Sequence, residues 1–107
     1  MRISSTIRFY DPSLKKSFLK LKEGDESEKE LFKFLSQAIQ NIEENAFCGI
    51  RIPKKIIPKE YKVNNLWKYD LPKGWRLVYS LESTEVYIVS IILEWFNHKE
   101  YENRFKY

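Results

Sequence analysis

The chain has 107 residues, of which 43% are hydrophobic and 32% are charged, and its mean hydropathy is -0.53. This length and composition predict one domain with a core of modest size. No apolar run approaches the roughly 20 residues that span a bilayer, and the start lacks the apolar core of a signal peptide, so we expect no membrane partner. Cys48, the single cysteine, excludes an internal disulfide and favours a cytoplasmic location.

Charge is distributed unevenly along the chain. The net charge is +4 and the isoelectric point is near 9.1, yet residues 23–45 are rich in acid. The basic stretch that follows contains Arg51, Lys54, Lys55, Lys59, Lys62, Lys68, Lys73 and Arg76. Segregated positive charge favours a polyanionic partner, because neutralised phosphates release their counterions. The alternative is a solvated basic loop in a lysine-rich protein.

The first half of the chain predicts a strand followed by two helices. Residues 2–10 alternate as a strand does, and Asp11 and Pro12 then fit the cap and first turn of a helix that Gly24 ends. A second helix follows the capping-box pattern of residues 27–30. The apolar positions at helical spacing are Leu14, Phe18 and Leu21, then Leu31, Leu35, Ala38 and Ile42. Two such helices form an αα-hairpin that must bury its apolar stripe.

An irregular segment is predicted for residues 46–65, because Gly49, Pro53 and Pro58 break both helices and central strands. Four isoleucines are expected to attach this segment to the core: Ile50, Ile52, Ile56 and Ile57.

From Leu66 the apolar period becomes two, which predicts strands. Residues 71–74 fit a type I turn that joins two strands into a hairpin. After this turn, the predicted inward side chains are Trp75, Leu77 and Tyr79, and those on the opposite face are Arg76, Val78 and Ser80. Residues 82–85 predict another turn, and residues 86–95 a central strand covered on at least part of both faces.

The order β-α-α-β-β-β predicts an α+β domain, with the helical hairpin on one face of a small, mainly antiparallel sheet. The other face of the sheet would then be open to a ligand.

Several standard catalytic motifs are absent from the sequence. It has no phosphate-binding glycine loop, no Cys or His spacing for zinc and no His-Glu motif on a helix. One histidine and one cysteine cannot build a conventional transition-metal site, so we expect no metal and no cofactor. Cys48 has no obvious activating partner and is interpreted as a packed, inert thiol.

Three side chains near the C-terminus could act together on a phosphate ester. The planar guanidinium of Arg76 suits phosphate oxygens, although a cross-strand salt bridge to Asp70 or Glu94 is an alternative. His98 is the only histidine, and imidazole suits proton transfer near neutral pH. Tyr101 lies one helical turn further on. The alternative for His98 is an exposed loop histidine without a catalytic role, and the alternative for Tyr101 is a tyrosine that packs over the sheet edge.

Residues 66–79, Leu-Trp-Lys-Tyr-Asp-Leu-Pro-Lys-Gly-Trp-Arg-Leu-Val-Tyr, with the apolar last strand and the His/Tyr tail, resemble the RelE/ParE superfamily of toxins from type II toxin–antitoxin modules. Upstream, residues 45–50, Asn-Ala-Phe-Cys-Gly-Ile, are similar to the Asn-Pro-Phe-x-Gly stretch of its YoeB branch. The resemblance implies a microbial RNase fold and an endoribonuclease that cleaves mRNA, in most members on the ribosome. It also implies attack of a ribose 2′-hydroxyl on the adjacent phosphate without a metal.

The resemblance further implies roles for individual residues. Arg76 matches the strand arginine that stabilises the charge growing on the phosphate. His98 or Tyr101 would correspond to the C-terminal acid/base group. Lys54 and Lys55 fall near the glutamate base of YoeB-like members and the lysines of RelE-like members. Lysines here favour charge stabilisation in place of a carboxylate base, which adds Lys55 to the expected catalytic set.

The remaining basic residues are expected to bind RNA: Arg51, Lys54, Lys59, Lys62, Lys68 and Lys73. The expected partners are mRNA, the ribosome and a cognate antitoxin protein, whose acidic or amphipathic segment would cover the basic face. Two alternatives stay open. One is a ParE-like inhibitor that binds DNA gyrase and cuts nothing, and the other is a decayed toxin that persists as a binding protein.

Overall fold

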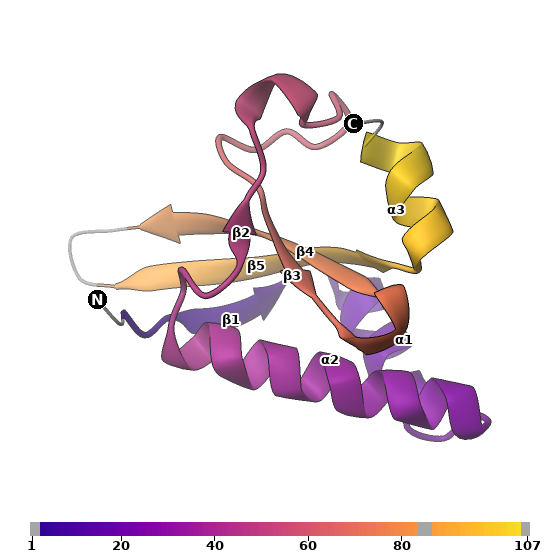
Figure 1. The fold of residues 1–107 in the computed structure, drawn as a ribbon. Coiled ribbons are helices and arrows are strands. Elements are labelled where there is room, and N and C mark those ends of the chain that lie inside the picture. Colours follow the sequence, from indigo (N-terminus) through magenta and orange to yellow (C-terminus); the bar gives the residue numbers. More distant parts are fainter. Residues whose placement is uncertain (1–2, 84–86, 106–107) are drawn as a thin grey trace.

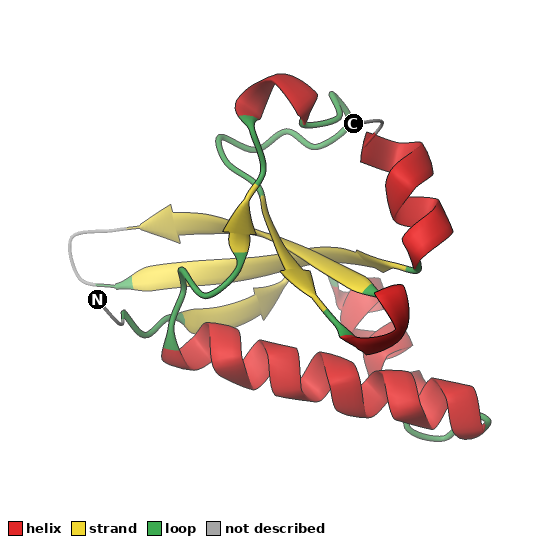
Figure 2. Ribbon diagram, viewed as in Figure 1, coloured by secondary structure: helices red, strands yellow, loops and turns green. Residues whose placement is uncertain are grey.

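The computed structural model describes residues 3–83 and 87–105 and shows a five-stranded sheet with helices (Figures 1 and 2). The elements are β1 (Thr6–Phe9), α1 (Pro12–Leu21), α2 (Glu26–Glu44), β2 (Ile50–Arg51), β3 (Trp67–Asp70), β4 (Arg76–Ser83), β5 (Ile88–Phe96) and α3 (His98–Phe105). Short 3-10 helices span Lys54–Ile56 and Pro72–Gly74. The strand order is β1-β5-β4-β3-β2, and only β1 and β5 pair in parallel among the described strands. The predicted α+β class and mainly antiparallel sheet are confirmed.

The two long helices begin at side-chain caps. Asp11 accepts a hydrogen bond of 2.8 Å from the Leu14 amide, and Pro12 occupies the first turn of α1, as predicted. The capping box of α2 is formed by Asp25 and Glu28, so its prediction at residues 27–30 is wrong by two positions. Asp and Glu both accept backbone hydrogen bonds well, so Asp25 caps the helix without a hydroxyl.

The helical hairpin covers one face of the sheet (Figure 1). The apolar stripe of α2 is buried as predicted, and its buried residues are Leu31, Leu35, Ala38 and Ile42. Leu77 and Tyr79 of β4 are fully buried against it, and Trp75 packs on the same cluster. The predicted inward face of this strand is therefore confirmed.

The opposite face of the sheet is largely covered, so the prediction of an open face is wrong. A second apolar cluster covers it, consisting of Ile52, Leu66, Val78, Leu93, Phe96, Tyr101 and Phe105. Two segments supply this cover, α3 and the irregular segment around residues 52–63 (Figure 1). The helix α3 begins at a capping box, in which Asn97 and Glu100 exchange hydrogen bonds of 2.8 and 3.0 Å. This Asn-x-x-Glu pattern is a helix-start signal, so the C-terminal tail is a packed helix.

Several predicted boundaries also differ from the structure. The first strand begins at Thr6 and not at residue 2, because the backbone of residues 3–5 hydrogen-bonds the end of α2 and the loop after it. Residue 2 itself lies outside the described residues. The turn at residues 71–74 is not type I, since Lys73 and Gly74 have φ angles of 61° and 79°.

The last two strands are longer toward their C-terminal ends than predicted. The strand β4 continues through Ser83, whereas a turn was predicted from residue 82, and the last strand ends at Phe96. Residues 84–86, which contain the rest of that predicted turn and the predicted start of the last strand, lie outside the described part. A bulge shifts the register between these strands, because Val78 pairs with Glu94 and Tyr79 pairs with Ile92.

Candidate phosphate-binding site

Two basic side chains share one carboxylate at the end of the β3–β4 hairpin. Asp70 pairs with Arg76 across the two strands. Its Oδ1 atom lies 2.9 Å from Arg76 Nε and 3.2 Å from Lys68 Nζ. The alternating strand geometry explains this contact, because Lys68, Asp70 and Arg76 all project from the same face of the sheet. The predicted alternative, a salt bridge from Arg76 to Asp70, is therefore present.

Glu94, the other predicted salt-bridge partner of Arg76, makes different contacts. It accepts a hydrogen bond of 2.6 Å from the Tyr61 hydroxyl and lies 3.4 Å from Arg104 Nη1. Burial and this carboxylate raise the pKa of Tyr61 above its usual range.

The guanidinium of Arg76 is held in place by the turn that precedes it. Its Nη1 donates hydrogen bonds to the carbonyl oxygens of Gly74 at 2.9 Å and Trp75 at 3.3 Å. The Nε atom is close to Asp70 but has no hydrogen bond, so this contact is an ion pair whose N–H does not point at the carboxylate. Only 18% of the side chain is exposed, and the guanidinium is thus a cation of fixed position.

An aromatic ring lies beneath both cations. Tyr101 of α3 is 3% exposed, and its ring centroid is 5.5 Å from Arg76 Cζ and 5.7 Å from Lys68 Nζ. The ring also stacks on Phe105 at 4.5 Å between centroids. Cations at this distance from a ring face are stabilised by its quadrupole. We call Lys68, Asp70, Arg76 and Tyr101 the charged cluster.

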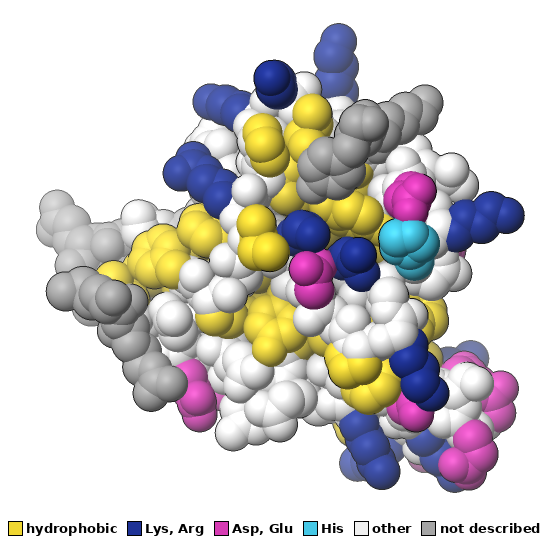
Figure 3. Space-filling model, in the orientation of Figure 1, with side chains coloured by type: hydrophobic (Ala, Val, Ile, Leu, Met, Phe, Trp, Pro, Cys, Tyr) yellow, Lys and Arg dark blue, Asp and Glu magenta, His cyan; other side chains and the backbone are white. Residues whose placement is uncertain are grey.

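His98 lies beside the charged cluster and is oriented toward solvent. It is the first residue of α3 and packs against the turn that binds Arg76, since a Cβ added to Gly74 would lie 3.1 Å from the Cβ of His98. The side chain is 62% exposed, and Nε2 contacts the Glu102 carboxylate one helical turn further on. Figure 3 shows the histidine on the same side of the molecule as a group of acidic and basic side chains. The predicted helical turn is present, but Tyr101 is buried where His98 is exposed.

The other predicted basic residues fall into two groups. Those on the segment 52–63 are exposed and form no ion pair with any residue in the ranges 3–83 and 87–105; they are Lys54, Lys55, Lys59 and Lys62. The remaining two are directed elsewhere. Lys73 Nζ lies 2.6 Å from Glu30 of α2, and Arg51 pairs with Trp67, which places it on the sheet face opposite to Arg76. Lys68 is therefore the only predicted RNA-binding residue that the described structure places in the charged cluster.

Cys48 is exposed rather than packed, so that part of its prediction is wrong. Partial burial of its sulfur nevertheless raises the pKa of the thiol, which lowers its reactivity.

The positions of Lys68 and Asp70 were partly accessible from the sequence. Period-two alternation and the hairpin predict that both residues share a face with Arg76. Sequence reasoning missed the helix α3, although the Asn97-x-x-Glu100 pattern is a local signal for its start. It also missed that α3 packs on this face, and only a helix packed there supplies the ring beneath the cations.

The charged cluster carries two positive charges and one negative charge, and this net positive charge suits a phosphate. Within the described part of the chain, no group of three or more His, Cys, Asp or Glu side chains could hold a metal ion. No described helix is long and apolar enough to cross a bilayer. Comparison with protein-family models, with curated proteins and with solved structures found no match for this chain.

Proposed function

We propose that this protein is a RelE/ParE-like toxin that cleaves mRNA, and that the charged cluster binds the scissile phosphate. One observation carries the proposal: Lys68 and Arg76 lie over a single tyrosine ring and have only one carboxylate between them. Holding two cations this close costs free energy through their mutual repulsion, which a bound dianion or phosphodiester would relieve. Fixed cations of this kind also stabilise charge that develops in a transition state.

In the proposed reaction a ribose 2′-hydroxyl attacks the adjacent phosphorus. The 2′-oxygen forms a bond to phosphorus as its proton leaves, and the bond to the 5′-oxygen of the next nucleotide breaks. The products are a 2′,3′-cyclic phosphate and a 5′-hydroxyl that has gained a proton. Arg76 and Lys68 stabilise the charge on the phosphate oxygens. His98, exposed beside them, exchanges protons with the reacting 2′- and 5′-oxygens of the RNA.

The partners proposed with this activity are the ribosome and a cognate antitoxin. The exposed lysines of the segment 52–63 support a polyanionic partner, because they follow one another closely along the chain and form no ion pair with an acidic side chain among the described residues. Lys55 belongs to this group, where it would contribute charge to RNA binding.

A second candidate function is a ParE-like inhibitor that binds DNA gyrase without catalysis. The contacts of Arg76 and His98 favour it. Arg76 Nη1 is occupied by two backbone carbonyls, and the His98 imidazole is paired with Glu102. An arginine with only a structural role and a surface histidine without a catalytic role would make the same contacts.

A translating extract separates the two functions. We expect the wild-type protein to produce cuts at defined positions in mRNA, with 5′-hydroxyl ends. The replacement Arg76→Met should reduce the rate of mRNA cleavage by about 10²–10³-fold, which is the usual effect of removing one donor that stabilises a transition state. The control Lys15→Met removes an exposed cation from α1 and should cut at the wild-type rate. Intact mRNA together with gyrase-trapped DNA breaks would refute the RNase and support the gyrase inhibitor.

A further inference from the structure

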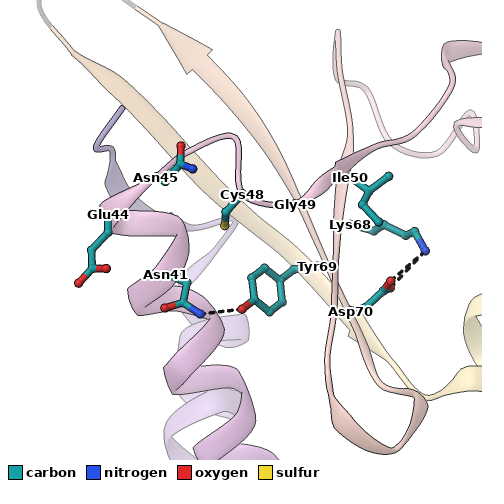
Figure 4. A pocket seen from close by; sticks show the side chains of 9 residues that line it. All are labelled: Asn41, Glu44, Asn45, Cys48, Gly49, Ile50, Lys68, Tyr69 and Asp70. Atoms are coloured by element: carbon teal, nitrogen blue, oxygen red, sulfur yellow. Dashed lines mark hydrogen bonds and ion pairs between the residues drawn. The ribbon is translucent and has the colours of Figure 1, made fainter. Parts of the chain in front are cut away.

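A pocket of about 380 Å³ opens at the edge of β3, directly beside the charged cluster (Figure 4). Its lining includes Asn41 of α2, Cys48 and Ile50 around the start of β2, and the three β3 residues Lys68, Tyr69 and Asp70. Lys68 and Asp70 thus belong to the pocket and to the charged cluster at the same time. The volume lies within the range of pockets that bind small organic groups.

The pocket exists because β2 is short. This strand has two residues and pairs only with Trp67 and Lys68, so Tyr69 lies beyond the end of the paired edge. The Tyr69 hydroxyl accepts a hydrogen bond of 2.6 Å from Asn41 Nδ2, whose own side-chain oxygen accepts one of 3.0 Å from Gln37. Figure 4 shows the Tyr69 ring reaching from β3 toward α2 across the pocket. The ring is therefore a fixed aromatic surface.

The loop that forms the opposite wall is also fixed. The Tyr79 hydroxyl donates to the Ala46 carbonyl at 3.0 Å and accepts from the Gly49 amide at 3.1 Å. Gly49 approaches β3 so closely that a Cβ there would lie 2.6 Å from the Lys68 carbonyl oxygen. These contacts hold Cys48 and Ile50 in place, and the pocket is preformed rather than opened by a ligand.

We infer that this pocket binds a nucleobase of the same RNA strand whose phosphate lies at Lys68 and Arg76. The inference rests on the proposed function. A fixed aromatic ring next to a cation site is how proteins bind single-stranded nucleic acid, since the base stacks while the phosphate pairs with positive charge. Tyr69 points to the helix side of β3, whereas the ion pair of Lys68 and Asp70 lies on the other side of this strand (Figure 4). Because both of these residues also line the pocket, the two subsites meet at one strand edge, and neighbouring nucleotides would reach both by passing around it.

The charge of one lining residue bears on which base the pocket would take. Glu44 is among the residues that line the pocket, and an ionised carboxylate only accepts hydrogen bonds. Cytosine carries an exocyclic amino donor at the position where uracil carries a carbonyl acceptor. We therefore assign the pocket to a base with an amino group, in preference to uracil.

The single cysteine makes this inference testable on the unmodified chain. Cys48 lines the pocket and is exposed, so its alkylation rate reports whether the pocket is occupied. The probe is a short 2′-O-methyl oligocytidylate, which lacks the attacking hydroxyl and cannot be cut. We expect this probe, at saturation, to slow alkylation by about tenfold, the effect of one stacked base. A 2′-O-methyl oligouridylate should protect less, and an abasic strand of equal length or inorganic phosphate should leave the rate unchanged.

Two variants check the assignment. Replacement Tyr69→Leu should abolish protection by oligocytidylate, whereas Tyr10→Leu removes an exposed tyrosine outside the pocket and should preserve it. Equal protection by abasic and base-containing strands, or an unprotected Cys48 in a complex that anisotropy shows to be formed, would overturn the inference. That result would leave the RNase proposal standing, because mRNA cleavage in the translating extract tests it separately. An oligonucleotide that does not bind at all would also overturn the inference, whereas only intact mRNA in the translating extract would refute the RNase.

Discussion

Replacement of Asp70 by asparagine should have opposite effects on stability and on anion binding. The carboxylate lies between Lys68 and Arg76, whose side chains are 19% and 18% exposed, while Asp70 itself is 45% exposed. It therefore stabilises two cations that would otherwise repel each other. It also opposes any phosphate that approaches the same two cations. The Asp70→Asn variant would keep the shape of the side chain and remove only the charge.

The magnitudes follow from distance and exposure. Two partly exposed ion pairs are lost, and we expect the free energy of unfolding to fall by about 1 kcal/mol. For a phosphate about 5 Å from the carboxylate, and an effective dielectric constant of about 40–80, removing one unit charge favours binding by about 1–2 kcal/mol. This corresponds to a dissociation constant that is lower by about 5–30-fold.

Urea unfolding, followed by tryptophan fluorescence, measures the first effect, and anisotropy with a labelled 2′-O-methyl oligonucleotide measures the second. The control Glu23→Gln changes the net charge by the same amount at an exposed site in the loop between α1 and α2, and should bind as the wild type does. The gain should also disappear when Asp70→Asn is combined with Arg76→Met. A gain of equal size in Glu23→Gln would show that net charge acts at long range, and no gain in Asp70→Asn would refute the phosphate site.

Four further predictions concern other parts of the molecule. His98→Ala should slow mRNA cleavage by about 10²–10⁴-fold without changing the urea midpoint, since the side chain is exposed; unchanged cleavage would make it a surface residue. Reversing Lys54 and Lys55 to glutamate should reduce the slope of log affinity for RNA against log salt by about one unit per lost phosphate contact, and an unchanged slope would show that the lysines are only solvated. Tyr79→Phe should lower the free energy of unfolding by about 1–3 kcal/mol, because a loop amide and a loop carbonyl lose their partner; a variant as stable as the wild type contradicts this. Cys48 should reach half-maximal alkylation at a higher pH in the folded protein than in urea, because its pKa is raised in the folded state. The thiol's contribution to stability is fully present below the unfolded pKa, and it should decline as pH rises through the folded pKa. Coincident folded and unfolded profiles would contradict the last prediction.

The elements that could be predicted from the sequence are those with a strong local pattern. Asp11 and Pro12 mark the start of α1, and the apolar stripe of α2 is buried as its spacing requires. Alternation in β4 separates Leu77 from Arg76 on two faces of the sheet, since Leu77 pairs with Tyr69 and Arg76 pairs with Asp70. In each case the residue pattern and the tertiary environment favour the same structure.

The errors arose where structure depends on distant contacts. The strand β2 has only two residues, too few for alternation to be visible, and it forms because Ile50 and Arg51 pair with β3. The second apolar cluster combines a proline-broken segment with the C-terminal helix, which no periodic pattern links. The charged cluster was predictable only in part, because one of its residues also depends on distant contacts. The strand residues Lys68 and Arg76 could be placed on one face, whereas the ring of Tyr101 beneath them depends on how α3 docks.

The parallel pairing of β1 with β5 constrains the order in which the domain can fold. Thr6 pairs with Val89, so most of the chain lies between the two partners, whereas β3, β4 and β5 follow one another through short connections. Closing a long loop costs entropy before its contacts repay it, and we expect the three consecutive strands to form first and β1 to join last. Every residue of the charged cluster comes from β3, β4 or α3. Transient detachment of the N-terminal strand would therefore leave the cluster assembled, and hydrogen exchange should be faster in β1 than in β4.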